Sequence, residues 1–469
     1  MNGSNRFRFP GTLGKLGLGL CFLLLPLASP GQYTTKGTLF TLQLTGPISN
    51  RLNVVFFSEG YTTSGLASHF LSDVTNAMAN LFTYQPYQEY QAYCNVFAIA
   101  VPSTHPGSTH PYYQETNGTF FGSSYDPVYD YIITIPAPGL KKMTNLLTSL
   151  LPQASLPIFL VNDYTDGGGG GVADVISVGP WQREILAHET GHTLGRLQDE
   201  YDYSYPDMNL TSSATAANTS QTTNLASISW NAWITNGTPI PTPDTPANAN
   251  TVGLFQGANY QTNGWYRPQH DCMMRTLGTP FCAVCSEALV KAICQKARVL
   301  DSFTPATNRI ITCTNLQPLL FTLVQPQPMT HDLTNQWYVN GLPVHDATNK
   351  DFTLWPAQYT NGSYTLQVSV HDPTALVKAD PSNCLKGSLT WKLNVNVYEL
   401  KLDNPRRVTP DGLSFRVSGN APYGFIIQGS TNLTLWKGIS TNSLTGGQYD
   451  FTNRLTNANG RFYRARLLP

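Results

Sequence analysis

The stretch "AHETGHTLGRLQDEY", residues 187–201, decides how the chain is interpreted. Residues four apart on an α-helix share a face, so this spacing brings the imidazoles of His188 and His192 from consecutive turns to one point in space. Glu189 projects from the adjacent angular position and can reach a water at that point. Two neutral imidazoles are good zinc ligands, and a carboxylate beside a zinc-polarised water can take its proton. The stretch predicts a zinc site with Glu189 as the general base.

The alternative to a metal site is an ordinary amphipathic helix whose histidines are buried and hydrogen-bonded in a core. Two glycines favour the metal site. Gly191 lies inside the predicted helix, where glycine costs about 1 kcal/mol relative to alanine, so we expect it to relieve crowding. Gly195 follows His192 by three residues and is expected to take the left-handed conformation that ends the helix. A chain that turns there can bring a further ligand back to the metal.

The spacing alone does not identify the third ligand of the metal. The general metzincin motif, HExxHxxGxxH, places a histidine where this chain has Gln198, a poor zinc ligand. The full stretch is similar to the HExGHxxxxLxDEY signature of the IgA-peptidase family of zinc metallopeptidases. The acidic pair is then the family's own pattern, and Asp199 is the expected third ligand, with Glu200 and His270 as alternatives.

Four further segments extend this resemblance from about residue 51 to about residue 300. They are "LNVVFFSEGYT" (52–62), "CNVFAIAVPST" (94–104), "GGGGGVADVIS" (167–177) and the segment from "GWYRP" to "DCMMRTLGTPFCAVCSEAL" (264–289). In the last segment, Met274 fits the methionine of the Cys-x-Met turn beneath the zinc of metzincins, and an ordinary core methionine is the alternative. The resemblance implies an α/β metzincin-like catalytic domain.

The same analogy suggests where a substrate would bind. The segment 172–178 would be an edge strand to which an extended peptide adds by main-chain pairing. Tyr266 is a candidate for stabilising the oxyanion and Arg267 for binding substrate, with a structural role as the alternative for each. The implied activity is hydrolysis of peptide bonds in extracellular proteins, with Zn2+ as the cofactor.

Two other functions remain open at this point. One is a secreted binding or adhesion protein whose metal site is vestigial or structural, and Glu189 argues against it, because a structural zinc site has no use for that carboxylate. The other is a gluzincin-type peptidase with a distant glutamate as its last ligand, for which Glu287 is the obvious helical candidate.

The N-terminus and the composition indicate export. Arg6, Arg8 and Lys15 precede the apolar run 16–28, which is too short to span a bilayer and is typical of a cleaved secretory signal. The chain is 41% hydrophobic, which is enough apolar material to form hydrophobic cores. It is 12% charged with no net charge, so we expect no nucleic-acid partner. No later segment reads as transmembrane, and we expect a secreted protein, extracellular or periplasmic.

Changes in periodicity predict a multidomain protein. Strands alternate with helices up to about residue 300, apart from a polar excursion at 205–250, and the period then switches to two. The expected parts are a signal peptide at 1–32, a zinc metallopeptidase domain at 33–300, an immunoglobulin-like β-sandwich at 301–397 and a small all-β module at 398–469. Segments 301–309 and 402–412 are predicted linkers. The C-terminal β modules suggest glycan or surface binding.

Without Cys21 of the signal, seven cysteines remain. In an exported protein they are disulfide candidates, and Cys313 and Cys384 could tie the sandwich together. Four of the seven cluster between Cys272 and Cys294, where a four-thiolate zinc site is the alternative to disulfides.

Overall fold

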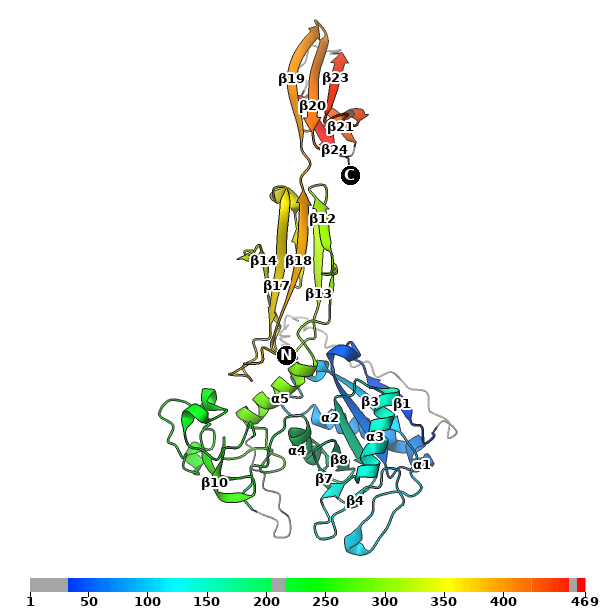
Figure 1. Cartoon of the computed structure of the whole chain (residues 1–469), viewed down its shortest axis with the longest axis vertical. Coiled ribbons are helices and arrows are strands. Elements are labelled where there is room, and N and C mark those ends of the chain that lie inside the picture. The colour runs from blue at the N-terminus through cyan, green and yellow to red at the C-terminus, as the bar shows by residue number, and fades with distance from the viewer. Residues whose placement is uncertain (1–32, 204–215, 423, 455–461, 469) are drawn as a thin grey trace, which may run out of the picture. The chain divides into compact units, whose positions relative to one another are not determined.

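The computed structural model describes residues 33–203, 216–422, 424–454 and 462–468, so the expected signal peptide lies outside the described residues. The chain is multidomain and rich in β-structure, with several sheets and few helices (Figure 1). One compact unit takes in 33–44, 53–80 and 95–189, and a second takes in the rest. Among the described residues, none of the helices has the length and apolar character that crossing a membrane requires.

The first unit is built on a six-stranded sheet of order β1-β3-β2-β6-β8-β7. Its central strands β2, β6 and β8 are parallel, whereas β1 is antiparallel to β3 and β7 is antiparallel to β8. The strands are β1 (Thr38–Gln43), β2 (Leu52–Glu59), β3 (Cys94–Ala100), β6 (Leu156–Val161), β7 (Gly168–Gly169) and β8 (Asp174–Ser177). The predicted strand 172–178 is therefore not the edge, because β7 covers it.

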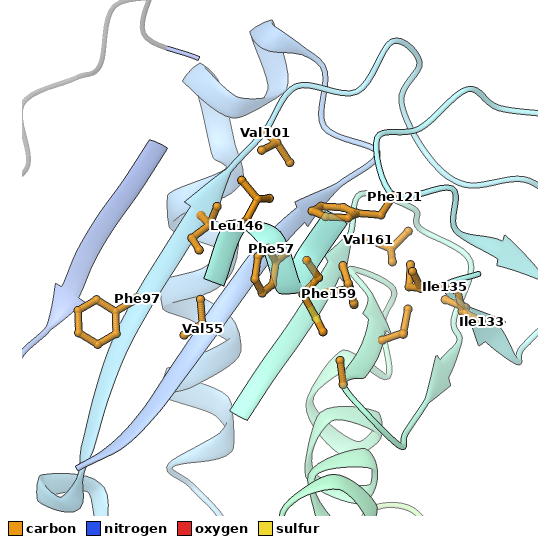
Figure 2. Close-up of a cluster of buried hydrophobic side chains, with 14 of the residues drawn as sticks. Val55, Phe57, Phe97, Val101, Phe121, Ile133, Ile135, Leu146, Phe159 and Val161 are labelled. Atoms are coloured by element: carbon orange, nitrogen blue, oxygen red, sulfur yellow. The ribbon is translucent and has the colours of Figure 1, made fainter. Parts of the chain in front are cut away.

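The central strands are apolar at consecutive positions because both faces of the sheet are buried. Val55 and Phe57 of β2 point to one face and Phe56 to the other, and all three are fully buried. On the first face, Leu146 of helix α3 (Ala137–Leu150) packs into the same apolar cluster as Val55 and Phe57 (Figure 2). Besides 3₁₀ turns, the other helical segments of the described residues are α1 (Thr63–Gly65), the π-turn Leu66–Phe70, α2 (Leu71–Leu81), α4 (Gln182–Thr193) and α5 (Ala283–Lys296).

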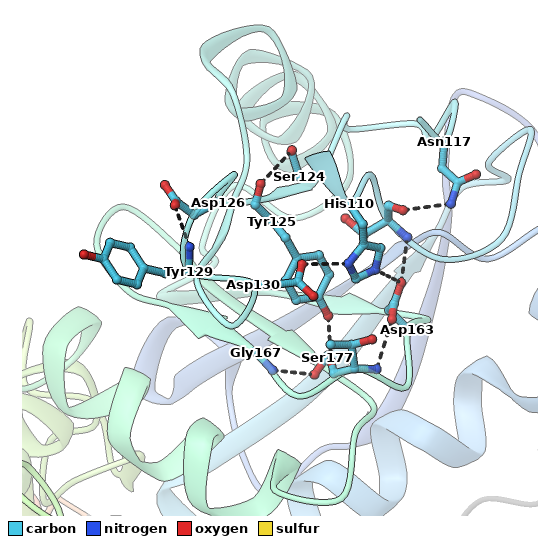
Figure 3. Close-up of polar contacts among 12 residues, drawn as sticks. His110, Asn117, Ser124, Tyr125, Asp126, Tyr129, Asp130, Asp163, Gly167 and Ser177 are labelled. Atoms are coloured by element: carbon cyan, nitrogen blue, oxygen red, sulfur yellow. Dashed lines mark hydrogen bonds and ion pairs between the residues drawn. The ribbon is translucent and has the colours of Figure 1, made fainter. Parts of the chain in front are cut away.

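A long connection between β3 and α3 is held by a buried histidine. His110 Nδ1 lies 2.9 Å from Asp130 Oδ1, and His110 Nε2 lies 3.0 Å from Asp163 Oδ2. The ring also stacks on Tyr125, with centroids 4.1 Å apart (Figure 3). Burial lowers the pKa of His110, but its hydrogen bonds and ion pairs with the two carboxylates outweigh burial and raise the pKa above its usual value. Tyr125 belongs to β4 (Ser124–Tyr125), which pairs with β5 (Ile133–Thr134).

The predicted excursion at 205–250 has little regular structure but is not merely a surface loop. Its described part, from residue 216, contains short 3₁₀ turns at Leu225–Ser227, Asn231–Trp233 and Pro246–Asn248. Trp230 is 2% exposed, and its indole N–H donates to the carbonyl of Gly253 at 2.9 Å. The segment is thereby fixed beside the hairpin of β9 (Phe255–Ala258) and β10 (Gln261–Arg267), which the period of the sequence did not reveal.

Beyond α5, two sheets enclose an apolar core in which Trp337 and Trp391 stack with centroids 5.6 Å apart. One sheet has the order β11-β13-β16 and the other β12-β18-β17-β14-β15. Their strands are β11 (Ser302–Thr304), β12 (Ile310–Thr314), β13 (Leu319–Val324), β14 (Thr334–Val339), β15 (Leu342–Pro343), β16 (Asp351–Leu354), β17 (Gly362–His371) and β18 (Lys386–Asn396). The predicted linker 301–309 contributes β11 to the first sheet.

The last part of the chain has two three-stranded sheets, β19-β20-β23 and β22-β21-β24, around a small aromatic core. Its strands are β19 (Leu400–Thr409), β20 (Gly412–Gly419), β21 (Phe425–Ser430), β22 (Lys437–Asn442), β23 (Gln448–Arg454) and β24 (Phe462–Leu467). The prediction of a linker at 402–412 was wrong, since most of it is β19. Pro405 is accommodated because β19 is an edge strand whose register shifts between Asp403 and Arg406.

The expected disulfides are not formed. All seven cysteines of the described part are thiols. Cys313 Sγ, on β12, lies 3.9 Å from the carbonyl of Asn394, whereas Cys384 Sγ lies 3.3 Å from Asp380 Oδ1. Each sulfur of the predicted Cys313–Cys384 pair therefore has a different neighbour.

The His110 network predicts a pH dependence of stability. Because the pKa of His110 is higher in the folded than in the unfolded chain, the imidazolium stabilises the fold below the unfolded value of about 6.5. That contribution is lost as the pH rises through the raised pKa. Replacing His110 by Gln should lower the melting temperature more at about pH 5 than at about pH 8. The exposed His345 is the matched control, and an equal loss at both pH values for His110→Gln would contradict this assignment.

Candidate metal centre

Helix α4 ends in a way that redirects the chain toward its own last turn. The N–H of Leu197 donates to the carbonyl of Gly191 at 3.0 Å, and the N–H of Arg196 donates to that of His192 at 3.0 Å. Arg196 has a φ of 52°, the left-handed conformation of a Schellman motif. The expectation that Gly195 takes this conformation was wrong. Gly195 is small for a different reason, because a Cβ there would lie 2.8 Å from the carbonyl oxygen of Gly191.

The turn places Asp199 against His192. His192 Nδ1 lies 2.8 Å from the carbonyl of Leu197, and His192 Nε2 lies 3.3 Å from Asp199 Oδ1. A carbonyl only accepts, so Nδ1 carries a proton, and in the neutral ring Nε2 then presents a lone pair to the carboxylate. Two lone pairs at this separation repel unless a cation lies between them. The geometry therefore requires a metal ion or a proton between the two atoms, carried either by the ring or by the carboxyl group.

His188 favours the metal ion. It lies one turn before His192 on α4, and ligand atoms of His188, His192 and Asp199 all lie within 4.8 Å of one another. Two imidazoles and a carboxylate are a donor set that zinc accepts. The two alternatives for the third ligand lie elsewhere, since Glu200 groups with cysteines and His270 forms an ion pair with Asp244.

Asp199 is oriented by the β9–β10 hairpin. The carboxylate is 5% exposed, and the hydroxyl of Tyr260 donates to its Oδ2. The N–H of Asn259 donates to the backbone carbonyl of Asp199 at 2.9 Å. Asn259 and Tyr260 both have positive φ values, of 51° and 63°, which is the cost of bringing the hairpin turn to this position. The sequence reading missed Tyr260, and only its place at the turn of "GANYQTNG" could have indicated it.

Glu189 lies against the glycine-rich strand β7. A Cβ on Gly168 would lie 2.9 Å from Glu189 Oε1 and 3.2 Å from Glu189 Cγ. Only a glycine lets the backbone approach the carboxylate this closely. Gly168, within the run of five glycines at 167–171, therefore lets β7 pack against the carboxylate of Glu189.

Met274 packs beneath the motif helix. A Cβ on Gly191 would lie 2.5 Å from Met274 Sδ, so the prediction that Gly191 relieves crowding is confirmed. Met274 is fully buried, and its carbonyl accepts from the N–H of Glu200 at 2.8 Å. The methionine thus contacts both the helix that carries the histidines and the segment that carries the third ligand.

The contacts of the remaining candidates in the described part of the chain are with other residues. Arg267 is fully buried and donates to Asp244 and to the carbonyls of Gln256 and Gly257, which gives it a structural role and no support as a substrate contact. Tyr266 is half-buried, and its backbone pairs with Ser220. Glu287, the ligand of the gluzincin alternative, bonds to Trp233, Lys291 and the N–H of Lys378.

Comparison with known families agrees with this geometry. The chain matches the family described as IgA Peptidase M64 over residues 40–248 and 244–293, which is more than half of its length. The chain belongs to the IgA peptidase M64 family. The membership makes it a peptidase hydrolase, and a peptidase implies a protein substrate. No curated protein matches the chain.

Two solved structures illustrate weak likenesses to this M64 peptidase. The apo structure of Bacteroides uniformis beta-glucuronidase 3 has 7% identity and a TM-score of 0.15, covering 44% of this chain and 28% of its own. Three N-terminal domains of the bacteriophage RB49 outer capsid protein Hoc have 12% identity and a TM-score of 0.18, covering 33% and 57%. The chain thus spans less than a third of the glucuronidase and just over half of the Hoc fragment. Likenesses at this level say nothing about function.

Tyr260 yields a test of how Asp199 is held. Removing its hydroxyl in Tyr260→Phe should weaken zinc binding by about 10-fold or more, because partners that orient a ligand typically contribute that much. Competition with a chromophoric chelator measures the affinity. Tyr112→Phe, at an exposed site, is the matched control. Unchanged affinity in Tyr260→Phe would show that the hairpin does not orient the ligand.

The contact between Gly191 and Met274 yields a second test. Gly191→Ala should lower the free energy of unfolding by about 1–3 kcal/mol, since overpacking outweighs the helix propensity of alanine. In a Met274→Ala background the same substitution should cost less, because the sulfur it meets is gone. Chemical denaturation of the four proteins measures the coupling. Additive costs would mean that the strain arises elsewhere.

Proposed function

We propose that this M64 family member is a secreted zinc-dependent endopeptidase that cleaves extracellular proteins. The observation that carries the proposal is the approach of His192 Nε2 to Asp199 Oδ1 at 3.3 Å, with His188 on the same helix. A cation between these atoms removes the repulsion, and a divalent ion satisfies all three donors at once. His188, His192 and Asp199 would hold the ion, and their imidazole and carboxylate chemistry suits zinc.

Glu189 follows the first histidine directly on α4 and supplies the proton transfers. A bound zinc ion provides a Lewis acid and a water whose pKa falls toward about 7. Glu189 takes the proton of the attacking water and then delivers it to the leaving amine. Gly168 keeps β7 close to the carboxylate and so limits the positions that Glu189 can occupy. Met274 and Tyr260 take no part in the proton transfers. Met274 packs against α4, and Tyr260 orients the carboxylate of Asp199.

Each part of the chain would have a separate role. A signal peptide at 1–32 would direct export, and 33–300 would form a metzincin-like catalytic domain. Residues 301–397 would form an immunoglobulin-like sandwich, a view supported by the two sheets that enclose Trp337 and Trp391. Residues 398–469 would be a separate β module with its own core. The alternative of an adhesion protein with a structural metal leaves Glu189 beside the ligands without a role.

Glu189→Gln is the direct test of the reaction. The amide is nearly isosteric with the carboxylate but cannot accept the proton, so proteolysis of an unfolded protein substrate should fall by about 100-fold or more while zinc content is unchanged. The assay follows fluorescent peptide release, and metal is counted by elemental analysis. Glu184→Gln, on the same helix, is the matched control and should retain activity. A fully active Glu189→Gln enzyme would refute the assigned base.

A further inference from the structure

A second group of potential metal ligands lies next to the third ligand in the sequence. Glu200, Cys272, Cys282 and Cys285 each offer one ligand atom, and these atoms all lie within 4.8 Å of one another. All four residues are buried. They come from three segments: the turn after α4, the Cys-Met-Met turn and the start of α5. The sequence reading grouped Cys272, Cys282 and Cys285 with Cys294, but Cys294 is not in this cluster.

The carboxylate of Glu200 lacks a full set of partners. Glu200 is fully buried, and its Oε1 lies 2.9 Å from Asn218 Nδ2 and 3.1 Å from Cys285 Sγ. Its Oε2 has no hydrogen-bond partner among the described residues. Arg267 attracts the carboxylate at longer range, but its guanidinium donates to other groups. A buried, ionised carboxylate with an unsatisfied oxygen is costly, and either protonation or a bound cation removes that cost.

The cysteines are arranged as metal-binding thiolates usually are. The N–H of Cys282 donates to Cys272 Sγ at 3.2 Å, and the N–H of Cys285 donates to Cys282 Sγ at 3.4 Å. Cys282 is the N-cap of α5, so Cys282 and Cys285 meet the positive end of the helix dipole. Amide N–H groups and a helix N-terminus both stabilise negative sulfur.

We propose that Glu200, Cys272, Cys282 and Cys285 bind a second, structural zinc ion. Three thiolates and one carboxylate complete a four-coordinate shell, and a closed, buried shell leaves no position for substrate or water. A disulfide explains the cluster less well. It would use two sulfurs and leave the third thiol beside a buried carboxylate that still lacks a cation.

This site would support the proposed catalytic centre without taking part in the reaction. Glu200 follows Asp199 directly, and its N–H donates to the carbonyl of Met274. An ion held by Glu200 and Cys272 would therefore fix the third ligand and the methionine beneath the helix relative to α5. The four ligand atoms are brought together by the fold whether or not the chain cleaves peptides.

The first experiment counts metal in full-length protein. After metal removal and reconstitution with zinc, His188→Ala/His192→Ala should retain one zinc ion per chain, and adding Cys282→Ser/Cys285→Ser should remove it. Cys294→Ser in the same background is the matched control, since this buried cysteine of α5 lies outside the cluster. Metal-free protein in the histidine variant would overturn the proposal, whatever happens to the proposed function.

The second experiment avoids substitutions in the cluster. Cobalt(II) replaces zinc in the His188→Ala/His192→Ala protein, and thiolate ligation should give an intense sulfur-to-cobalt charge-transfer band in the near ultraviolet. Alkylation of the unfolded, unreduced, metal-free protein should label Cys272, Cys282 and Cys285, as identified by mass spectrometry. Lack of the band, or a pair of these cysteines that reacts only after reduction, would show that the cluster is not a metal site.

Discussion

The hydrogen bond from His192 Nδ1 to the carbonyl of Leu197 is the interaction on which the site depends. It fixes the tautomer of the ring, so that Nε2 is the atom available to a metal. It also spans the turn after α4, in which Arg196 takes the left-handed conformation. The same turn delivers Asp199 to the histidine. The carbonyl of Leu197 thereby determines that Nε2 of His192 is available to a metal, and it lies in the turn that positions Asp199 beside that atom.

Much of the first unit could be predicted from the sequence because its signals are local. Continuous apolar runs such as that of β2 and the three- and four-residue period of α2 indicate their structures directly. The helical spacing of His188, Glu189 and His192 likewise needs no knowledge of the rest of the chain. Asp199 is different, because helical spacing cannot place a residue beyond the helix end. Its assignment came from a family signature, and the distance to His192 now supports it.

The features that sequence reasoning missed depend on contacts distant along the chain. Tyr260 reaches Asp199 only because the β9–β10 hairpin folds back over the turn. Glu200 joins three cysteines more than seventy residues away, and nothing in its local sequence separates it from Asp199 as a ligand. The sequence 402–412 contains two prolines and several charges, which are typical of a linker. An edge strand tolerates both, so composition alone could not distinguish the two.

The form of β19 has a consequence for how this protein behaves at high concentration. An edge strand exposes a row of amide and carbonyl groups that another chain can extend into an intermolecular sheet. In β19, Pro405 removes one donor, the register shift between Asp403 and Arg406 bends the strand, and Arg406 and Arg407 are exposed. A second molecule docking edge to edge would meet a kinked, positively charged border that offers no regular ladder. These features oppose self-association of the C-terminal β-structure, so the module can remain exposed without promoting aggregation.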